Sequence, residues 1–394
     1  MNNYQFETNA IRLQMEQSNQ KEHSTPLFLT SSFTFDNAEQ GEAIFKGELK
    51  ANLYSRFSNP NVDEFIQKLC VLENAESGIG TATGMAAVYT SFASLLKQGD
   101  HIISSSSVFG NTQYILKHLL PNMGIESSTV NIADNNAYIS AIKENTKAIF
   151  VETPSNPSLQ MADLNFLGQL CKKRNLILIV DNCFATPYLQ KPIDFGAHIV
   201  LHSATKFIDG QGRVLGGAIV GKKEIVDRCY DFLRRTGASL SPFNAWILSK
   251  SLETLALRMD RHCANALRIA RFLSKSAFCI RVSYPGLACH DQFELASKQM
   301  RKGGAIVSCV LKGGKARAID FLNKLDLFSL TANLGDSRSI ATHPASTTHS
   351  KLSKEEQEDQ GISEGLIRFS VGLEHIDDLL SDIEKALKKS QSNE

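Results

Sequence analysis

Lys206 is the side chain of this sequence best placed to act as a nucleophilic amine. It follows a short apolar run at 199–201, lies beside the hydroxyls of Ser203 and Thr205, and precedes a Gly-rich turn at 210–217. An amine must lose its proton before it attacks a carbonyl, and partial burial lowers a lysine's pKa in that direction. The two hydroxyls can donate hydrogen bonds to an anion. We therefore expect Lys206 to form an imine next to a bound anion.

Asp181 is the second candidate, because it ends another apolar segment. Five consecutive apolar residues, 176–180, precede it. A carboxylate buried there is costly unless a cation lies nearby, although a helix N-cap is the simpler alternative. A lysine that forms an imine and an acid that pairs with a pyridinium nitrogen are what pyridoxal 5′-phosphate requires of a protein. The two residues together predict a pyridoxal phosphate site, with Lys206 and Asp181 as its catalytic groups.

Several motifs in a fixed order extend this interpretation to nearly the whole chain. Val-Asp-Asn at 180–182, Ser-Ala-Thr-Lys at 203–206 and His-Pro-Ala-Ser-Thr-Thr-His at 343–349 resemble those of the Cys/Met-metabolism (transsulfuration) family. The resemblance runs from about residue 25 to about residue 387. It implies an α/β fold of type I among pyridoxal phosphate enzymes, similar to aspartate aminotransferase. We expect a large domain with a mostly parallel sheet and a smaller C-terminal α/β domain.

A run of small residues at 77–87 leads into an alanine-rich helix. The N-terminus of a helix suits a phosphate, although an ordinary helix start looks the same. No clear strand is predicted before this run, and it matches no dinucleotide or P-loop motif. The resemblance implies that the backbone N–H groups of Gly84 and Met85 bind the cofactor phosphate, together with the hydroxyls of Ser203 and Thr205.

Residues 1–58 lack a steady hydrophobic period, which is typical of an arm that packs on another domain or subunit. The resemblance implies that Tyr54 and Arg56 reach the cofactor phosphate of a neighbouring subunit. Arginine is suited to bidentate phosphate contact, whereas a loop tyrosine and a solvated arginine are the simpler interpretation. The resemblance also implies a homotetramer, built as a dimer of dimers.

Three polar residues are candidates for substrate binding. Arg368 stands inside an apolar strand at 365–371, and buried arginines are rare unless they are paired. The resemblance gives Arg368 a substrate carboxylate as partner, with Ser339 as a second carboxylate contact. It places Asn156 near the cofactor ring hydroxyl and the same carboxylate, although an asparagine before proline can be merely structural.

The chain departs from many relatives at three places. Phe109 replaces a tyrosine that stacks on the cofactor ring, and it cannot donate a proton to a leaving group. Arg338 replaces a glutamate, which favours a substrate with an anionic distal group. The sequence Gly-Gln-Gly-Arg-Val at 210–214 also differs from the usual one. These changes are similar to the O-succinylhomoserine sulfhydrylase branch of the family.

The expected reaction is therefore γ-replacement on O-succinylhomoserine by sulfide. This transferase step gives homocysteine and succinate and belongs to methionine biosynthesis. Cystathionine γ-synthesis with cysteine, O-acetylhomoserine sulfhydrylation and a cystathionine or methionine lyase remain alternatives. A further alternative is a non-catalytic binding protein that kept the fold. Loss of Lys206 or Asp181 would have indicated such a protein, but the sequence has both residues.

Composition limits the remaining possibilities. The 394 residues are expected to divide into an arm (1–58), a cofactor-binding domain (59–250) and a C-terminal domain (251–394). A net charge of +1 favours neither nucleic acid nor an anionic membrane as partner. The eight scattered cysteines form no C-x-x-C pair, which argues against a zinc site and a disulfide framework. The polar N-terminus and the lack of about 20 consecutive apolar residues predict a cytoplasmic protein.

Overall fold

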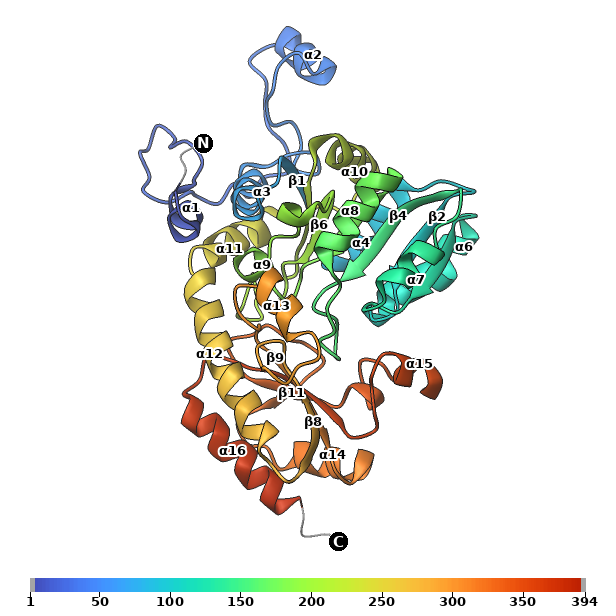
Figure 1. Ribbon diagram of the computed structural model, residues 1–394. Coiled ribbons are helices and arrows are strands. Elements are labelled where there is room, and N and C mark those ends of the chain that lie inside the picture. The colour runs from blue at the N-terminus through green and yellow to red at the C-terminus, as the bar shows by residue number, and fades with distance from the viewer. Residues whose placement is uncertain (1–3, 391–394) are drawn as a thin grey trace.

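Two β-sheets, each covered by helices, form the fold in the computed structural model, which describes residues 4–390 (Figure 1). The larger sheet has the order β1-β7-β6-β5-β4-β2-β3. The five strands from β6 to the edge strand β3 are parallel, and β7 runs antiparallel to both β6 and β1. Its strands are β1 (Ser77–Thr81), β2 (His101–Ser105), β3 (Glu126–Val130), β4 (Thr146–Glu152), β5 (Ile177–Asp181), β6 (Ile199–Ser203) and β7 (Gly217–Gly221).

Strand β5 shows why this sheet forms the core of the large domain. A parallel sheet with helices on both faces needs strands that are apolar on both sides. Leu178 and Val180 are buried in one hydrophobic cluster, and Ile179 between them is buried in another. Two cores therefore form on opposite faces of the same strand, and the first polar side chain is Asp181 at its carboxyl end.

Strand β1 corrects the expectation that no clear strand precedes Gly84. It pairs with β7 over its whole length, from Ser77 opposite Gly221 to Thr81 opposite Gly217. Its sequence Ser-Gly-Ile-Gly-Thr has little intrinsic strand propensity, so the strand forms because of its pairing with β7 and its packing. A Cβ on Gly78 would stand 2.8 Å from Val220 and 2.9 Å from Ile66, which shows how closely helix α3 (Pro60–Glu73) covers this strand.

The helices of the arm and of the large domain follow the same alternation with strands that the sequence predicts. They are α1 (Phe6–Arg12), α2 (Ala38–Lys46), α3 (Pro60–Glu73), α4 (Gly84–Leu95), α5 (Gly110–Tyr114), η1 (Ile115–Leu119), α6 (Leu120–Asn122), α7 (Asn135–Ser140), α8 (Leu164–Arg174), α9 (Thr186–Leu189), η2 (Pro192–Phe195), α10 (Lys223–Thr236) and α11 (Pro242–Leu252). In Figure 1 the arm projects from the domain, with α2 at its tip.

The smaller sheet carries the C-terminal domain, with the order β10-β11-β12-β9-β8. Its central strand β12 is antiparallel to both neighbours, so Arg368 faces Thr342 on one side and Ser308 on the other. The elements are α12 (Leu255–Ser274), β8 (Cys279–Ser283), α13 (Phe293–Gln299), β9 (Ile306–Leu311), α14 (Gly314–Asn323), β10 (Ser329–Leu330), β11 (Ile340–Thr342), η3 (Pro344–Ser346), α15 (Lys354–Asp359), β12 (Leu366–Ser370) and α16 (Ile376–Lys389).

Helix α12 runs from the large domain along the small one (Figure 1). The predicted mostly parallel large sheet and the second, smaller α/β domain are confirmed. The exact domain borders remain predictions; the one between 250 and 251 falls inside α11. No helix within residues 4–390 has the length and apolar character that a membrane crossing requires.

Candidate active site

A cavity of about 240 Å³ lies where the strands β4, β5 and β6 of the large domain end. Ligands of open parallel sheets bind at the carboxyl ends of the strands, because those ends face the same side. Arg368 from β12 of the small domain lines the same cavity. The structure brings together nine residues predicted for the site: Gly84, Met85, Phe109, Asn156, Asp181, Ser203, Thr205, Lys206 and Arg368.

Two carboxylates from neighbouring strands lie in the cavity wall. Asp181 is opposite Glu152 in the register of β5 and β4. Asp181 Oδ1 accepts a hydrogen bond from the N–H of Cys183 (3.0 Å), and Glu152 Oε2 accepts one from the N–H of Phe109 (2.8 Å). Burial raises the pKa of both carboxyl groups. A cationic ring nitrogen beside Asp181 would offset that burial, since an opposite charge favours the ionised carboxylate.

Lys206 lies in the turn that follows β6. Its N–H donates to the carbonyl of Ser203 (3.1 Å), and its carbonyl accepts from the N–H of Gly210 (2.8 Å). The Nζ atom donates to Oδ1 of Asn333 at 2.5 Å. Burial lowers the pKa of the Lys206 amine, and the nearby guanidinium of Arg368 lowers it further. Both effects favour the neutral amine that nucleophilic and base chemistry need.

The N-terminus of helix α4 forms one end of the cavity. Thr83 caps the helix by accepting from the N–H of Ala86 (3.0 Å), which leaves the N–H groups of Gly84 and Met85 without a partner inside the helix. A Cβ on Gly84 would stand 2.6 Å from Cβ of Ser203 and 2.8 Å from its hydroxyl oxygen. Only glycine therefore lets the helix end approach Ser203, and the cradle so formed has the donors that a phosphate requires.

Arg368 crosses from the small domain to the large one. It is 1% exposed, Nη1 donates to Oδ1 of Asn156 (2.9 Å), and Nη2 donates to the carbonyl of Asn333 (3.1 Å). Its Nε is buried without a hydrogen-bond partner among residues 4–390. Burial lowers the pKa of the guanidinium to about 10. A buried cation with an unused donor fits an anionic ligand such as a carboxylate.

Two predicted substrate contacts are not brought to the cavity. The hydroxyl of Ser339 donates to Glu374 (2.9 Å) and accepts from the N–H of Gly372 (2.8 Å), so it is used within the small domain. Arg338 is paired with Asp336 at 3.0 Å, and its side chain is 65% exposed. Neither residue is part of the cavity lining. The assignment of Ser339 and Arg338 to substrate binding therefore stays a prediction, and the contacts of both residues in this structure lie within the protein.

Asn333 is the site residue that the sequence analysis missed. Its side chain contacts the Lys206 amine and its carbonyl contacts Arg368. It stands in a Thr-Ala-Asn-Leu-Gly loop without hydrophobic periodicity. The Gly335 that follows has φ +78°, which favours glycine, and a turn at this glycine is the one signal that could have drawn attention to the loop.

Tyr54 and Arg56 lie outside the cavity of their own chain. Arg56 donates to the carbonyl of Arg234, and its guanidinium lies 4.7 Å from the ring centroid of Phe57. Tyr54 is 42% exposed. Neither residue contacts the cavity of its own chain, and their contact with a neighbouring subunit stays a prediction.

A profile of the Cys/Met metabolism PLP-dependent enzyme family matches residues 7–388. The chain belongs to this family. Its cofactor is pyridoxal 5′-phosphate, and the fold is that of the type I pyridoxal phosphate enzymes. The resemblance found in the sequence is thereby confirmed.

Relatives with different activities match almost the whole chain. An O-succinylhomoserine sulfhydrylase of Pseudomonas aeruginosa is 43% identical over 382 residues, which covers 97% of this chain and 95% of the relative. An L-methionine gamma-lyase of Pseudomonas putida is 42% identical over 367 residues, with coverage of 93% and 92%. A Campylobacter jejuni crystal structure that contains N′-pyridoxyl-lysine 5′-monophosphate is 36% identical, with a TM-score of 0.94 and coverage of 98% and 100%.

The cradle at Gly84 gives a first prediction. Gly84→Ala should weaken binding of pyridoxal phosphate, because the new Cβ would displace Ser203 or the start of α4. The measurement is visible absorbance of the cofactor on titration into the apoprotein. Gly110→Ala is a matched control at another helix start, where the nearest atom would be 3.7 Å away, and it should bind the cofactor as the parent does. Equal affinities of both variants would contradict the prediction.

The attachment residue gives a second prediction. Borohydride reduction of the holoenzyme, followed by peptide mapping, should place the pyridoxyl group on Lys206, the one lysine in the cavity lining among the described residues. Lys206→Ala should give no labelled peptide under the same treatment. A pyridoxyl group on any other lysine would overturn the site.

Proposed function

We propose that this protein replaces the succinyloxy group of O-succinylhomoserine with sulfide: the bond between Cγ and the ester oxygen breaks, a Cγ–S bond forms, and the products are homocysteine and succinate. The family relationship supports amino-acid chemistry dependent on pyridoxal phosphate. The choice of O-succinylhomoserine as substrate is supported by the uncharged wall of the cavity. Its charged residues do not distinguish between the activities of the similar relatives.

The residues of the cavity have separate roles in this proposal. When bound, pyridoxal phosphate withdraws electrons from the α-carbon of an amino acid. Asp181 would keep the ring nitrogen protonated, and the N-terminus of α4 with Ser203 would hold the phosphate. The Lys206 amine takes and returns protons at the substrate carbons, which its lowered pKa favours.

The substrate carboxylate is assigned to Arg368 and Asn156. Arg368 has a buried Nε without a partner, and it already contacts Asn156. A carboxylate beside these groups would fix the α-carbon relative to Lys206. The amide oxygen of Asn333 accepts a hydrogen bond from the Lys206 amine and so holds that amine at the same place.

Phe109 is the observation that carries the proposal. It lines the cavity beside Glu152, and no tyrosine is among the described residues of the lining. Expulsion of a thiolate from the γ-carbon benefits from a general acid, whereas succinate leaves as a stable anion. Tyr54 of the neighbouring subunit is assigned to the phosphate, so a wall that has no phenolic donor of its own favours an ester substrate over a thioether.

Methionine γ-elimination is the second candidate, because a methionine γ-lyase is nearly as similar to this chain as the sulfhydrylase. Phe109 argues against it by the same reasoning. Cysteine as nucleophile and acetylhomoserine as substrate remain alternatives that share the same residues. Methionine biosynthesis is the pathway that the proposed product implies.

We also propose a homotetramer built from two dimers, in which each dimer exchanges its arms. Tyr54 and Arg56 lie outside the cavity of their own chain, on an arm that projects from the domain (Figure 1). A phosphate in the cavity has backbone donors from α4, and the one arginine among the described lining residues, Arg368, is engaged by Asn156 and Asn333. Arg56 of a second copy would supply a positive charge to the phosphate.

The substrate is tested by product analysis with four combinations. Succinyl- and acetylhomoserine are each assayed with sulfide and with cysteine, and we expect the largest kcat/KM for succinylhomoserine with sulfide. A larger value for cysteine would replace the proposal with cystathionine synthesis.

Phe109→Tyr should raise the rate of elimination from methionine by at least about tenfold, since general acids contribute factors of about 10²–10⁴ to a rate. Phe184→Tyr adds a hydroxyl elsewhere in the lining and should not do so.

The shared site is tested by hybrids. Arg56→Ala and Lys206→Ala proteins should each be nearly inactive, but mixed dimers should regain activity, because one site of each hybrid has both intact residues. Native mass spectrometry verifies that hybrids form. Hybrids without activity would refute the exchange of arms and leave the chemistry of Lys206 untouched.

A further inference from the structure

The turn that follows Lys206 is closed by a buried carboxylate. Asp209 is fully buried, and it accepts hydrogen bonds from the N–H of Arg213 (2.8 Å) and from Nε of the same residue (3.0 Å). The Arg213 guanidinium also donates to the carbonyl of Asp209 (3.0 Å) and to the hydroxyl of Ser251 (2.6 Å). Hydrogen bonds within the turn at 209–213 therefore fix its conformation, and the bond to Ser251 attaches it to α11.

Arg258 holds the same segment from helix α12. Its side chain is buried and donates to the carbonyls of Phe207 (2.6 Å) and Ile208 (3.0 Å), the two residues directly after Lys206. A Cβ on Gly210 would stand 2.0 Å from Nη1 of Arg258, so only glycine allows this approach. One side of the Lys206 backbone is thus fixed by the helix that joins the two domains.

The loop 331–338 of the small domain packs on the other side. A Cβ on Gly335 would stand 2.6 Å from the backbone nitrogen of Phe207 and 3.0 Å from Cα of Lys206. Two residues earlier, Asn333 accepts the hydrogen bond from the Lys206 amine. The position of this loop therefore determines where the acceptor for the amine lies.

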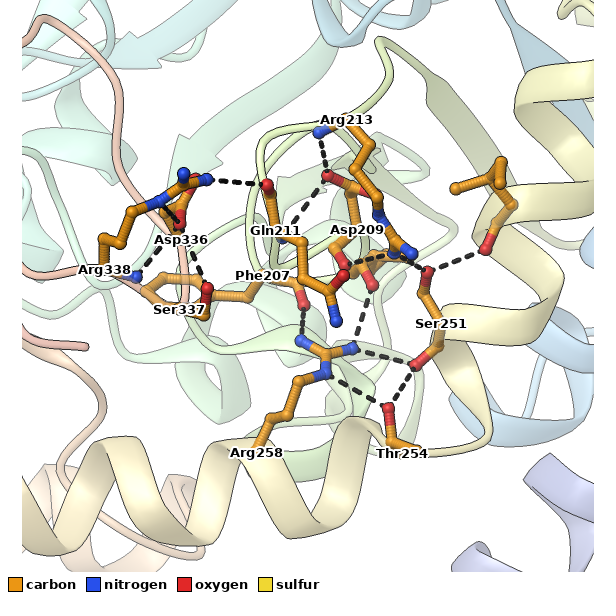
Figure 2. A network of polar contacts seen from close by, with 12 residues as sticks. Phe207, Asp209, Gln211, Arg213, Ser251, Thr254, Arg258, Asp336, Ser337 and Arg338 are labelled. Atoms are coloured by element: carbon orange, nitrogen blue, oxygen red, sulfur yellow. Dashed lines mark hydrogen bonds and ion pairs between the residues drawn. The ribbon is translucent and has the colours of Figure 1, made fainter. Parts of the chain in front are cut away.

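Arg338 and Asp336 join the loop to the turn. Figure 2 shows the two residues on one side of Gln211, with Asp209 and Arg213 on the other side and Arg258 below. Arg338 Nε donates to Asp336 Oδ1 (3.0 Å), and Nη2 donates to the carbonyl of Gln211 (3.0 Å). Asp336 also accepts from the N–H of Arg338 (3.0 Å). This guanidinium bridges the two segments that enclose Lys206.

We propose that Arg338 and Asp336 are positioning residues, which dock the loop 331–338 on the turn 209–213 and so hold Asn333 against the Lys206 amine. The loop belongs to the small domain and the turn to the large one, so the pair also fixes the small domain at the site. The proposal rests on the role proposed for Lys206, but it does not depend on which acylhomoserine is the substrate.

Kinetics of the holoenzyme test the proposal. Arg338→Ala should lower kcat by roughly tenfold to a hundredfold, because a misplacement of about 1 Å costs that order of rate. The ratio of KM for the succinyl and acetyl esters should stay the same. Arg338→Ala should cause no further loss in an Asn333→Ala background, since it acts through Asn333. Arg338→Lys retains the charge and one hydrogen bond and should recover part of kcat.

Amide hydrogen exchange of the holoenzyme gives a readout that needs no turnover. Arg338→Ala should speed exchange in the peptides covering 207–216 as well as 331–338, although the substitution lies in only one of them. Arg268→Ala removes a comparable exposed pair, with Asp377 at 2.9 Å, and should change neither kcat nor these peptides. The melting temperature should change little in either variant, because exposed ion pairs contribute little to stability.

Three results would overturn the proposal. A rise in KM confined to the succinyl ester would mean that Arg338 contacts the acyl group. Losses of kcat that multiply in the double variant would mean that Arg338 does not act through Asn333. Faster exchange in 331–338 alone would mean that the loop and the turn are not coupled. If the acylhomoserines prove not to be substrates, the exchange result still decides the matter.

Discussion

The burial of Arg368 between the two sheets is the constraint on which the site depends. A guanidinium that is 1% exposed needs hydrogen-bond acceptors, and it finds them in Asn156 of the large domain and in the carbonyl of Asn333. These contacts require the end of β4, the loop before β11 and the centre of β12 to meet at one point. A substrate carboxylate bound at the remaining donor would complete this charge arrangement, so that binding and the docking of the domains would use the same cation.

Much of the site could be predicted from the sequence, because strand ends are visible in it. Asp181 and Lys206 each follow a run of apolar residues, and the parallel sheet brings those ends together. Arg368 was recognised by the same logic, as a charge inside an apolar strand. Strand β1 escaped notice because its two glycines and its serine have little strand propensity, and only its pairing with β7 forms it.

The contacts made by the loop 331–338 of the small domain could not be predicted from the local sequence pattern. Asn333 and Ser339 are both polar residues in one short segment before β11, and the sequence offers no means to choose between them. The turn at Gly335 against the Lys206 backbone directs Asn333 to the amine, while Ser339 faces Glu374 and Gly372. From the sequence alone Arg338 favours an anionic substrate, because its partner Asp336 and the carbonyl of Gln211 become apparent only in three dimensions.

The charges of the cavity lining show what a second copy of the chain would contribute to the proposed site. Among the described residues of the lining, the charged ones are Lys206, Arg368, Glu152 and Asp181. The two carboxylates lie opposite each other at the ends of β4 and β5, and both cations are engaged by Asn333. A phosphate at the start of α4 therefore meets neutral donors within one chain, although helix N-termini and hydroxyls alone compensate only part of its charge. An arginine contributed by a neighbouring arm would supply the missing charge without adding a cation beside Lys206, whose amine must stay neutral to act as a base.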